Sequence, residues 1–417
     1  QPAGAPSAGP ELDLSAAERV RWIFQLAPTL FPAEKIKGKD TSIDFDLAGE
    51  GLWRLTWSDD GATAQKDPAG EPAASRVKAD PAVLCNVIDR KIDAAEAFRQ
   101  MKIVASRMAD FLSFSEILRT QDYTKAIADA LAECPVQVPS DYMGRTFHES
   151  PLVIRYEHAS DYARATSVDN PKYFRDKSEI VETPPLLAVR YHFDLARTIL
   201  TDPALEVNIM RLVHGEQEMI FHQPLRPGDV IVPKASICDV EHKEAGSLIT
   251  ISFRLMREGQ LANETFSRYF VRRDRSGGDK KKKKEEPKPV IEKPDFTVAV
   301  DVAGDQSKLY AKASLDENPI HLNLDIARAA GFKALVLHGL CVLGFASNAV
   351  IAQAAGDDPT RLASIKARFS RPVFMGDRLE TRGSIGKKKD ETKVAFEVVN
   401  QDNVPVITAG LADIRPS

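Results

Sequence analysis

One stretch of the sequence occurs twice, as YARATSVDNPKY at residues 162–173 and as YAKASLDENPIH at residues 310–321. The twelve aligned positions contain five identities and three conservative pairs, at an offset of 148 residues. A second pair of segments, 221–229 and 369–377, matches at Phe, Pro, Gly and Asp with the same offset. Two matches at one offset indicate that the chain beyond about residue 135 contains two copies of one fold.

Each copy is predicted to contain a long apolar helix after the Asn-Pro turn, followed by several strands. One helix with many short alternating strands favours an α+β architecture in which an antiparallel sheet curls around the helix. Residues 334–356 carry no formal charge and are numerous enough to cross a bilayer. They nevertheless contain His338, Asn348 and Gln353 and have no aromatic belt. We therefore expect a buried helix here, and no integral membrane segment.

Changes in composition suggest the domain boundaries. We place the first copy at 135–274 and the second at 295–417. Between them, residues 275–294 contain a five-lysine run followed by acids and prolines, which is typical of a solvated linker. Residues 11–118 are predicted to form a separate small α+β domain. In it, a hairpin over 43–57 precedes a helix that starts at Pro81.

Composition excludes several classes of function. A net charge of -4 gives no case for a nucleic-acid partner. The sequence has no Gly-x-Gly-x-x-Gly motif and no histidine spacing typical of zinc, so we expect neither a cofactor nor a metal. The four cysteines lie far apart, without a Cys-x-x-Cys motif, which favours a reducing compartment. They are Cys85, Cys134, Cys238 and Cys341.

The two copies differ at the positions that could perform chemistry. Asp316 and His321 of the second copy stand where the first copy has Val168 and Tyr173. A carboxylate and an imidazole five residues apart around an Asn-Pro turn can converge on one water, one removing its proton while the other delivers a proton elsewhere. Taken alone, such a turn or a single histidine is more often structural. Within the repeat, the difference favours a catalytic second copy and a first copy kept for binding or packing.

The segments SLDENPIH at 314–321, AAGF at 329–332 and LHGLC at 337–341 resemble the MaoC-like (R)-specific enoyl-CoA hydratase family. This family, also called hydratase 2, includes a part of the peroxisomal multifunctional enzyme type 2. The resemblance covers about residues 135–415 and implies a double hot-dog fold, with two antiparallel sheets each wrapping a long helix. It also implies reversible hydration of trans-2-enoyl-CoA to (R)-3-hydroxyacyl-CoA in fatty acyl metabolism, without a cofactor.

The resemblance assigns roles to individual residues. Asp316 and His321 would hold and activate water, and Asn318 would support the turn. The backbone N–H of Gly339, at the start of a long helix, would donate to the thioester oxygen, where a lost donor typically costs about 3 to 4 kcal/mol of barrier. We interpret His338 as structural. Three cations near the motif are candidates for substrate binding at the CoA phosphates, although each is more often a surface charge: Lys333, Arg368 and Arg371.

Two other functions remain open from the sequence. The same acid-base pair could serve a dehydratase that acts on carrier-protein thioesters, because the two substrates differ only in the group that carries the acyl thioester. Alternatively, both copies could be scaffolds of a non-catalytic lipid or acyl-CoA carrier. Leu315 motivates this second alternative because the family usually has Gly at this position.

The N-terminal domain carries a weaker resemblance. The stretch AFRQMKI at 97–103, together with the order of elements over about 15–118, resembles the sterol-carrier-protein type of lipid-binding domain. Glycines expected in that family are absent around Met101. The resemblance implies a bound acyl chain or sterol; the alternative is a helper or dimerisation domain with a filled core. We further predict an acyl-CoA partner, compatibility with a homodimer, and a cytoplasmic location, or a peroxisomal one if the chain is eukaryotic.

Overall fold

The structure is a computed structural model that divides the chain into two compact units. One contains Gln1–Cys134 and His242–Ala245, and the other contains Pro135–Glu241 and Gly246–Ser417. Among the described helices, none combines the length and apolar character that a membrane crossing requires. The described residues are 14–132, 134, 136, 138–139, 142–243, 245–273, 290–388 and 391–416.

The N-terminal unit is built on a five-stranded sheet with the order β3-β2-β1-β4-β5. The expected hairpin is present, with Phe45 of β1 opposite Trp53 of β2. Asp80 caps α4 as expected, since its Oδ1 accepts from the Ala82 N–H at 2.8 Å. The strands are β1 Thr41–Leu47, β2 Gly51–Ser58, β3 Gly61–Lys66, β4 Ser75–Ala79 and β5 Ile103–Ala105. The helices are α1 Ala16–Gln25, α2 Ala27–Leu30, α3 Ala33–Ile36, α4 Pro81–Ile88, α5 Ala94–Arg99, α6 Met108–Arg119 and α7 Tyr123–Ala132.

Aromatic side chains fill the centre of this unit. The Phe45 and Phe114 rings lie 4.7 Å apart between centroids, and Phe24 lies 5.1 Å from Phe45. All three are fully buried. The unit continues past residue 118, the limit suggested by composition, because α7 buries Tyr123 and Ile127 in the same core.

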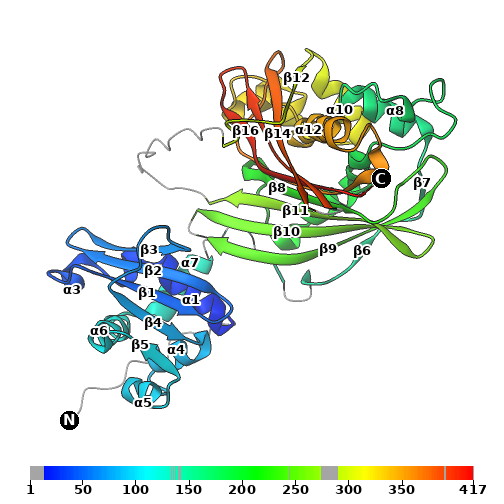
Figure 1. Ribbon diagram of the computed structural model, residues 1–417. Helices are drawn as coiled ribbons and strands as arrows, with labels where there is room; N and C mark the ends of the chain where they lie inside the picture. Colours follow the sequence, from blue (N-terminus) through cyan, green and yellow to red (C-terminus); the bar gives the residue numbers. More distant parts are fainter. Residues whose placement is uncertain are drawn as a thin grey trace, which may run out of the picture. The chain divides into compact units, whose positions relative to one another are not determined.

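The C-terminal unit contains a continuous 11-stranded sheet (Figure 1). Two separate sheets were expected, but β8 of the first half pairs with β13 of the second and joins them into one. The remaining arrangement agrees with the α+β double hot-dog fold implied by the resemblance. The first-half strands are β6 Phe147–His148, β7 Leu152–Val153, β8 Leu212–Phe221, β9 Val230–Lys243, β10 Gly246–Arg257 and β11 Gln260–Arg272. The second-half strands are β12 Phe296–Asp301, β13 Leu362–Phe369, β14 Arg378–Lys388, β15 Glu391–Asn400 and β16 Pro405–Ile414.

The pairing between the halves follows the internal repeat. Glu218 of β8 lies opposite Lys366 of β13, and these two residues are separated by the repeat offset of 148. The hydroxyls of Tyr162 and Tyr310, separated by the same offset, meet at 3.3 Å. Tyr162 lies on α8 (Tyr156–Ala165) and Tyr310 on α10 (Gln306–Ser314). A local twofold axis therefore passes between the two copies.

The apolar stretch after His338 forms the buried helix α12 (Gly339–Ala354), as expected. It contacts strands of the second half, while its Asn348 side chain donates to the Thr166 carbonyl of the first half at 3.1 Å. The prediction of a long helix in the first half is wrong. That half has a 3-10 segment, η3 (Pro185–Tyr191), and the short helix α9 (Phe193–Leu200). Pro203 lies three residues beyond the end of α9, and proline disfavours the helical conformation of the residue before it, Asp202.

The segment predicted as a linker, 275–294, lies outside the described residues except for 290–294. At its described end, the backbone N–H groups of Val290 and Ile291 donate to the Glu397 carboxylate at 3.0 and 3.1 Å. This contact fixes the approach to β12.

Candidate active site

The predicted catalytic turn follows the end of α10. Leu315 caps this helix in the left-handed conformation, with φ 65°. A non-glycine residue in this conformation costs about 1 to 2 kcal/mol, which explains a preference for glycine here. The turn is built despite this cost: the Asp316 N–H donates to Ser314 Oγ at 3.2 Å, and Asp316 Oδ1 accepts from the Asn318 N–H at 3.2 Å.

Asn318 and His321 lie on the next turn, η6 (Pro319–His321). Asn318 caps it by accepting from the Ile320 N–H at 3.3 Å. His321 is buried, and its Nδ1 lies 2.6 Å from the Val336 carbonyl oxygen. A carbonyl only accepts, so Nδ1 carries the hydrogen and Nε2 of the neutral ring has a free lone pair. Burial lowers the pKa of His321, while the Asp316 carboxylate opposes this shift.

His338 completes a compact cluster with these residues. Its Nε2 donates to the Asp316 carbonyl at 2.9 Å, and its ring stacks on His321 with centroids 3.8 Å apart and planes at 28°. Burial lowers the pKa of His338 well below its ordinary value, and the neighbouring His321 adds to the effect. The side chain therefore connects the start of α12 to the catalytic turn.

The three polar side chains of the cluster lie close together. Potential ligand atoms of Asp316, His321 and His338 lie within 4.8 Å of one another. One nitrogen of each ring already donates to a backbone carbonyl, His321 Nδ1 to Val336 and His338 Nε2 to Asp316. Each neutral ring therefore keeps one nitrogen with a lone pair.

Gly339 is the first residue of α12. The first-turn N–H groups of a helix lack intrahelical acceptors and lie at the positive end of its dipole. A Cβ at Gly339 would lie only 3.0 Å from Cδ1 of Phe369. Glycine therefore allows the Phe369 ring of β13 to pack directly against this end of the helix.

Residues of the first half also face the site, which the sequence did not predict. The His214 ring lies 5.0 Å from Phe369 and 4.7 Å from Tyr269 between centroids. Its Nε2 donates to Gln217 Oε1 at 3.0 Å, and Ser267 Oγ donates to the same oxygen at 2.7 Å. Burial lowers the pKa of His214 to about 4, although the Gln217 contact and the negative charge of Asp316 oppose the shift. The sequence offered one signal for this residue: His214 corresponds to Leu362 in the second copy, so the two copies differ there by a polar side chain.

The three predicted substrate-binding cations differ in their contacts. Arg368 donates to Glu216 across the β8–β13 pair, at 2.6 and 2.9 Å, so its charge is already paired. Lys333 lies 4.5 Å from the centre of the Phe374 ring. Arg371 is exposed. Lys333 and Arg371 therefore remain the better placed of the three to meet an anionic ligand.

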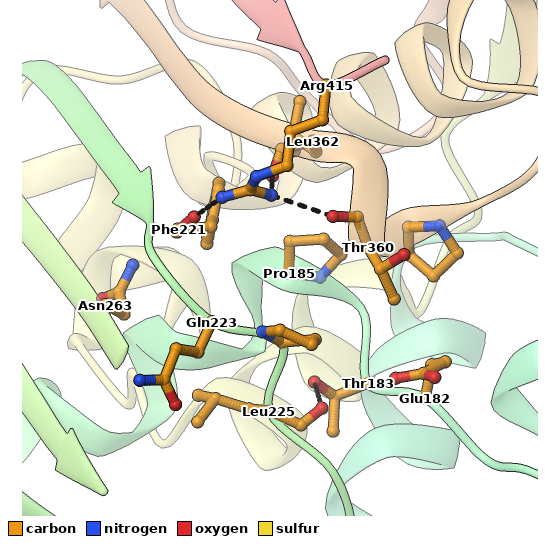
Figure 2. A pocket seen from close by; sticks show the side chains of 12 residues that line it. Glu182, Thr183, Pro185, Phe221, Gln223, Leu225, Asn263, Thr360, Leu362 and Arg415 are labelled. Carbon is orange, nitrogen blue, oxygen red and sulfur yellow. Dashed lines mark hydrogen bonds between the residues drawn. The ribbon is translucent and has the colours of Figure 1, made fainter. Parts of the chain in front are cut away.

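A small pocket of about 20 Å³ lies at the first-half version of these positions, and residues of both halves line it (Figure 2). Phe221, Pro185 and Gln223 line it, at the repeat positions of Phe369, Lys333 and Arg371. The Arg415 guanidinium donates to the Phe221 and Thr360 carbonyl oxygens at its wall (Figure 2). Pro185 and Gln223 therefore carry no charge at the two positions where the second half has Lys333 and Arg371.

Family models match both halves of the C-terminal unit. Residues 285–404 match the model described as "MaoC like domain". Residues 141–262 match the model described as "FAS1-like, dehydratase domain region". Both models are named for dehydratases, and each matches one copy of the repeat.

Three curated relatives cover this region. The chain is 28% identical to the "Probable enoyl-CoA hydratase 2" of Dictyostelium discoideum, covering 59% of this chain and 85% of the relative. It is 30% identical to the "3-hydroxyacyl-thioester dehydratase Y" of Mycobacterium tuberculosis, covering 45% of this chain and 68% of the relative. It is 32% identical to the "Peroxisomal multifunctional enzyme type 2" of Drosophila melanogaster, covering 52% of this chain and only 36% of that longer relative.

A solved structure supports the fold. The MaoC-like dehydratase from Phytophthora capsici superimposes with a TM-score of 0.56 at 23% identity, covering 67% of this chain and 98% of the other.

Proposed function

We propose that this chain, which belongs to the MaoC-like dehydratase family, catalyses the reversible hydration of trans-2-enoyl-CoA to (R)-3-hydroxyacyl-CoA in fatty acyl metabolism. One observation carries the proposal: a half-buried Asp316 lies beside a buried His321 whose Nε2 is free to accept a proton. The relative named "Probable enoyl-CoA hydratase 2" supports hydration as the reaction and enoyl-CoA as the substrate, and the match covers 85% of its length.

The cluster can perform the reaction by proton transfer alone. Water held between Asp316 and His321 gives a proton to Nε2 of His321 while its oxygen bonds to C3 of the enoyl group. The electron pair of the double bond moves toward the thioester oxygen, where the Gly339 N–H donates. The imidazolium, stabilised by the Asp316 carboxylate, then returns the proton to C2. One water is added and no electrons are transferred to or from the substrate, so the reaction requires no cofactor.

We assign the CoA end of the substrate to the exposed surface that carries Lys333 and Arg371. The repeat supports this assignment. The second half has Lys333 and Arg371 at two positions where the first half has the uncharged Pro185 and Gln223. A charge present in only the catalytic copy is better explained by an anionic ligand than by folding, which both copies share. The CoA phosphates supply such anions.

We assign the acyl chain to the first half. The 8-residue α9 stands where the second half has the 16-residue α12, so the first half places less helix against its sheet. We also propose that the N-terminal unit binds a lipid, on the sequence resemblance. A cytoplasmic location, or a peroxisomal one in a eukaryote, and a homodimer remain part of the proposal.

The test is the loss of enoyl absorbance with trans-2-enoyl-CoA of short and long chain, with determination of the product configuration. We expect (R)-product from the parent and a loss of about 100-fold or more in kcat for Asp316→Asn and His321→Ala. Tyr173→Phe is the matched control, because Tyr173 is the buried repeat equivalent of His321 and lies in the non-catalytic half. A folded parent that binds acyl-CoA without turnover would favour the carrier function. Turnover confined to carrier-protein thioesters would favour the dehydratase alternative.

A further inference from the structure

The segment that carries Asp316 is held from two sides. Arg190 of the first half donates through Nη1 to the carbonyl oxygens of Lys312 and Ala313, at 3.1 and 2.8 Å. His338 of the second half donates through Nε2 to the carbonyl oxygen of Asp316, at 2.9 Å. Three hydrogen bonds therefore reach three carbonyl groups within the five residues 312–316.

The two donors occupy the same position in the two copies. Arg190 and His338 are separated by the repeat offset of 148 residues. His338 bonds the turn of its own half, whereas Arg190 reaches across the local twofold axis to the other half. The first copy has thus lost the acid-base pair and carries, at this position, a longer cationic donor directed at the catalytic copy.

The backbone here requires such donors. The last carbonyl groups of α10 lack intrahelical partners, and a cation at a helix C-terminus meets the negative end of the dipole. Leu315 follows in a left-handed conformation that leucine disfavours. Arg190 is itself partly buried, and burial lowers the pKa of its guanidinium, so its hydrogen bonds to the two carbonyls also offset its own desolvation.

We propose that Arg190 and His338 are positioning residues that hold the turn so that the Asp316 carboxylate stays in register with His321. The inference rests on the proposed hydratase function. It assigns the first half a direct part in catalysis although that half has no catalytic residue of its own. A displacement of about 1 Å in a catalytic group can cost on the order of 100-fold in rate, so fixing this turn has a measurable consequence.

The experiment compares Arg190→Met, Arg190→Lys, His338→Phe and the double variant Arg190→Met/His338→Phe in the full chain. Methionine keeps an unbranched apolar stem and removes the donor; lysine restores one donor group; phenylalanine keeps a ring to stack on His321. Arg197→Met is the control, because Arg197 lies on α9 of the same half and pairs with Asp194 at the surface.

Two readouts separate positioning from general stability. The first is the kcat and KM for enoyl-CoA hydration. The second is hydrogen exchange by mass spectrometry on the peptide 310–321, with the peptide 339–354 of α12 as the internal reference. We expect Arg190→Met to lower kcat by about 10- to 100-fold with KM changed less than about threefold, and to raise exchange in 310–321 only. Lysine should recover most of both losses, and the double variant should lose less than the product of the single effects.

The inference is overturned if Arg190→Met keeps kcat and exchange in 310–321 within about twofold of the parent, or if exchange rises equally in α12, which would indicate general unfolding. The exchange measurement also distinguishes this inference from the proposed function. Suppose that the parent has no hydratase activity and that exchange in 310–321 still rises in Arg190→Met. This result would refute the proposed function, but it would support the role of Arg190 in holding the turn.

Discussion

The imidazole of His192 should make the C-terminal unit sensitive to acid. This side chain is 4% exposed and stacks on Phe253 with centroids 5.0 Å apart. Burial lowers the pKa of His192 to about 3. In the unfolded chain the same group has an ordinary pKa of about 6.5. The unfolded state therefore binds a proton between these two values while the folded state does not.

This difference in pKa sets the sign and the size of the pH effect on the free energy of unfolding. Because the folded pKa is lowered, the stability is fully present above about pH 6.5 and is lost as the pH falls toward 3. At pH 5 the unfolded state gains RT ln(1 + 10^1.5), about 2 kcal/mol, from protonation of this one residue, and the folded state gains almost nothing. Replacement by phenylalanine keeps a ring against Phe253 and removes the titrating group.

The assay is urea denaturation of the parent and His192→Phe at pH 7 and pH 5, followed by far-UV circular dichroism. All three tryptophans, Trp22, Trp53 and Trp57, lie in the N-terminal unit, so tryptophan fluorescence gives an internal control for acid effects elsewhere. Between the two pH values, the C-terminal unit of the parent should lose about 2 kcal/mol more than that of the variant. A difference below about 0.5 kcal/mol would refute the reasoning.

Four further predictions concern the site and the N-terminal unit. Gly339→Ala keeps the N–H but places a methyl group about 3.0 Å from Phe369, so kcat should fall about 10-fold and should recover in a Gly339→Ala/Phe369→Leu variant; equal activity of the two variants would contradict the steric argument. Because burial lowers the pKa of His321, the base stays neutral into the acid range, and kcat/KM should begin to fall only below pH 6.5; an acid limb centred at or above 6.5 would contradict this. Lys333→Met and Arg371→Met should each raise KM for enoyl-CoA about 3- to 10-fold, in line with one lost charge-assisted contact, and leave KM for a pantetheine thioester unchanged; an equal rise for both thioesters would contradict phosphate binding. If the N-terminal unit binds lipid, its tryptophans should transfer energy saturably to cis-parinaric acid, and an active protein without such transfer would contradict lipid binding.

The sequence predicted the parts of the structure that depend on local pattern and on the repeat. Two copies of one sheet-and-helix fold were predictable because two segments matched at one offset, and the resemblance of the 314–341 segments to the MaoC-like family implied the double hot-dog fold. Asp316 and His321 were predictable as candidates because their repeat partners, Val168 and Tyr173, cannot exchange protons. The structure places these two side chains together in one cluster.

The contributions that cross from one half to the other were not predictable from spacing. His214 reaches the site only because β8 pairs with β13, and Arg190 reaches α10 only because η3 packs against that helix. The length of the first-half helix depended on Pro203, a local signal that the repeat obscured. A comparison of two copies thus finds residues that changed, but only the tertiary fold shows what the changed residues contact.

The strand pairing at the local axis has a consequence for the origin of the fold. In a dimer of identical chains, a residue on the axis faces a copy of itself, so Glu218 would meet glutamate and Lys366 would meet lysine. In the joined chain these two positions carry opposite charges, with Lys366 Nζ and Glu218 Oε2 3.4 Å apart. Like charges directly opposite one another on neighbouring strands are destabilising. Gene duplication and fusion therefore allowed a charge pattern that disfavours self-pairing of either half. If the two halves were expressed as separate polypeptides, they should assemble with each other in preference to themselves.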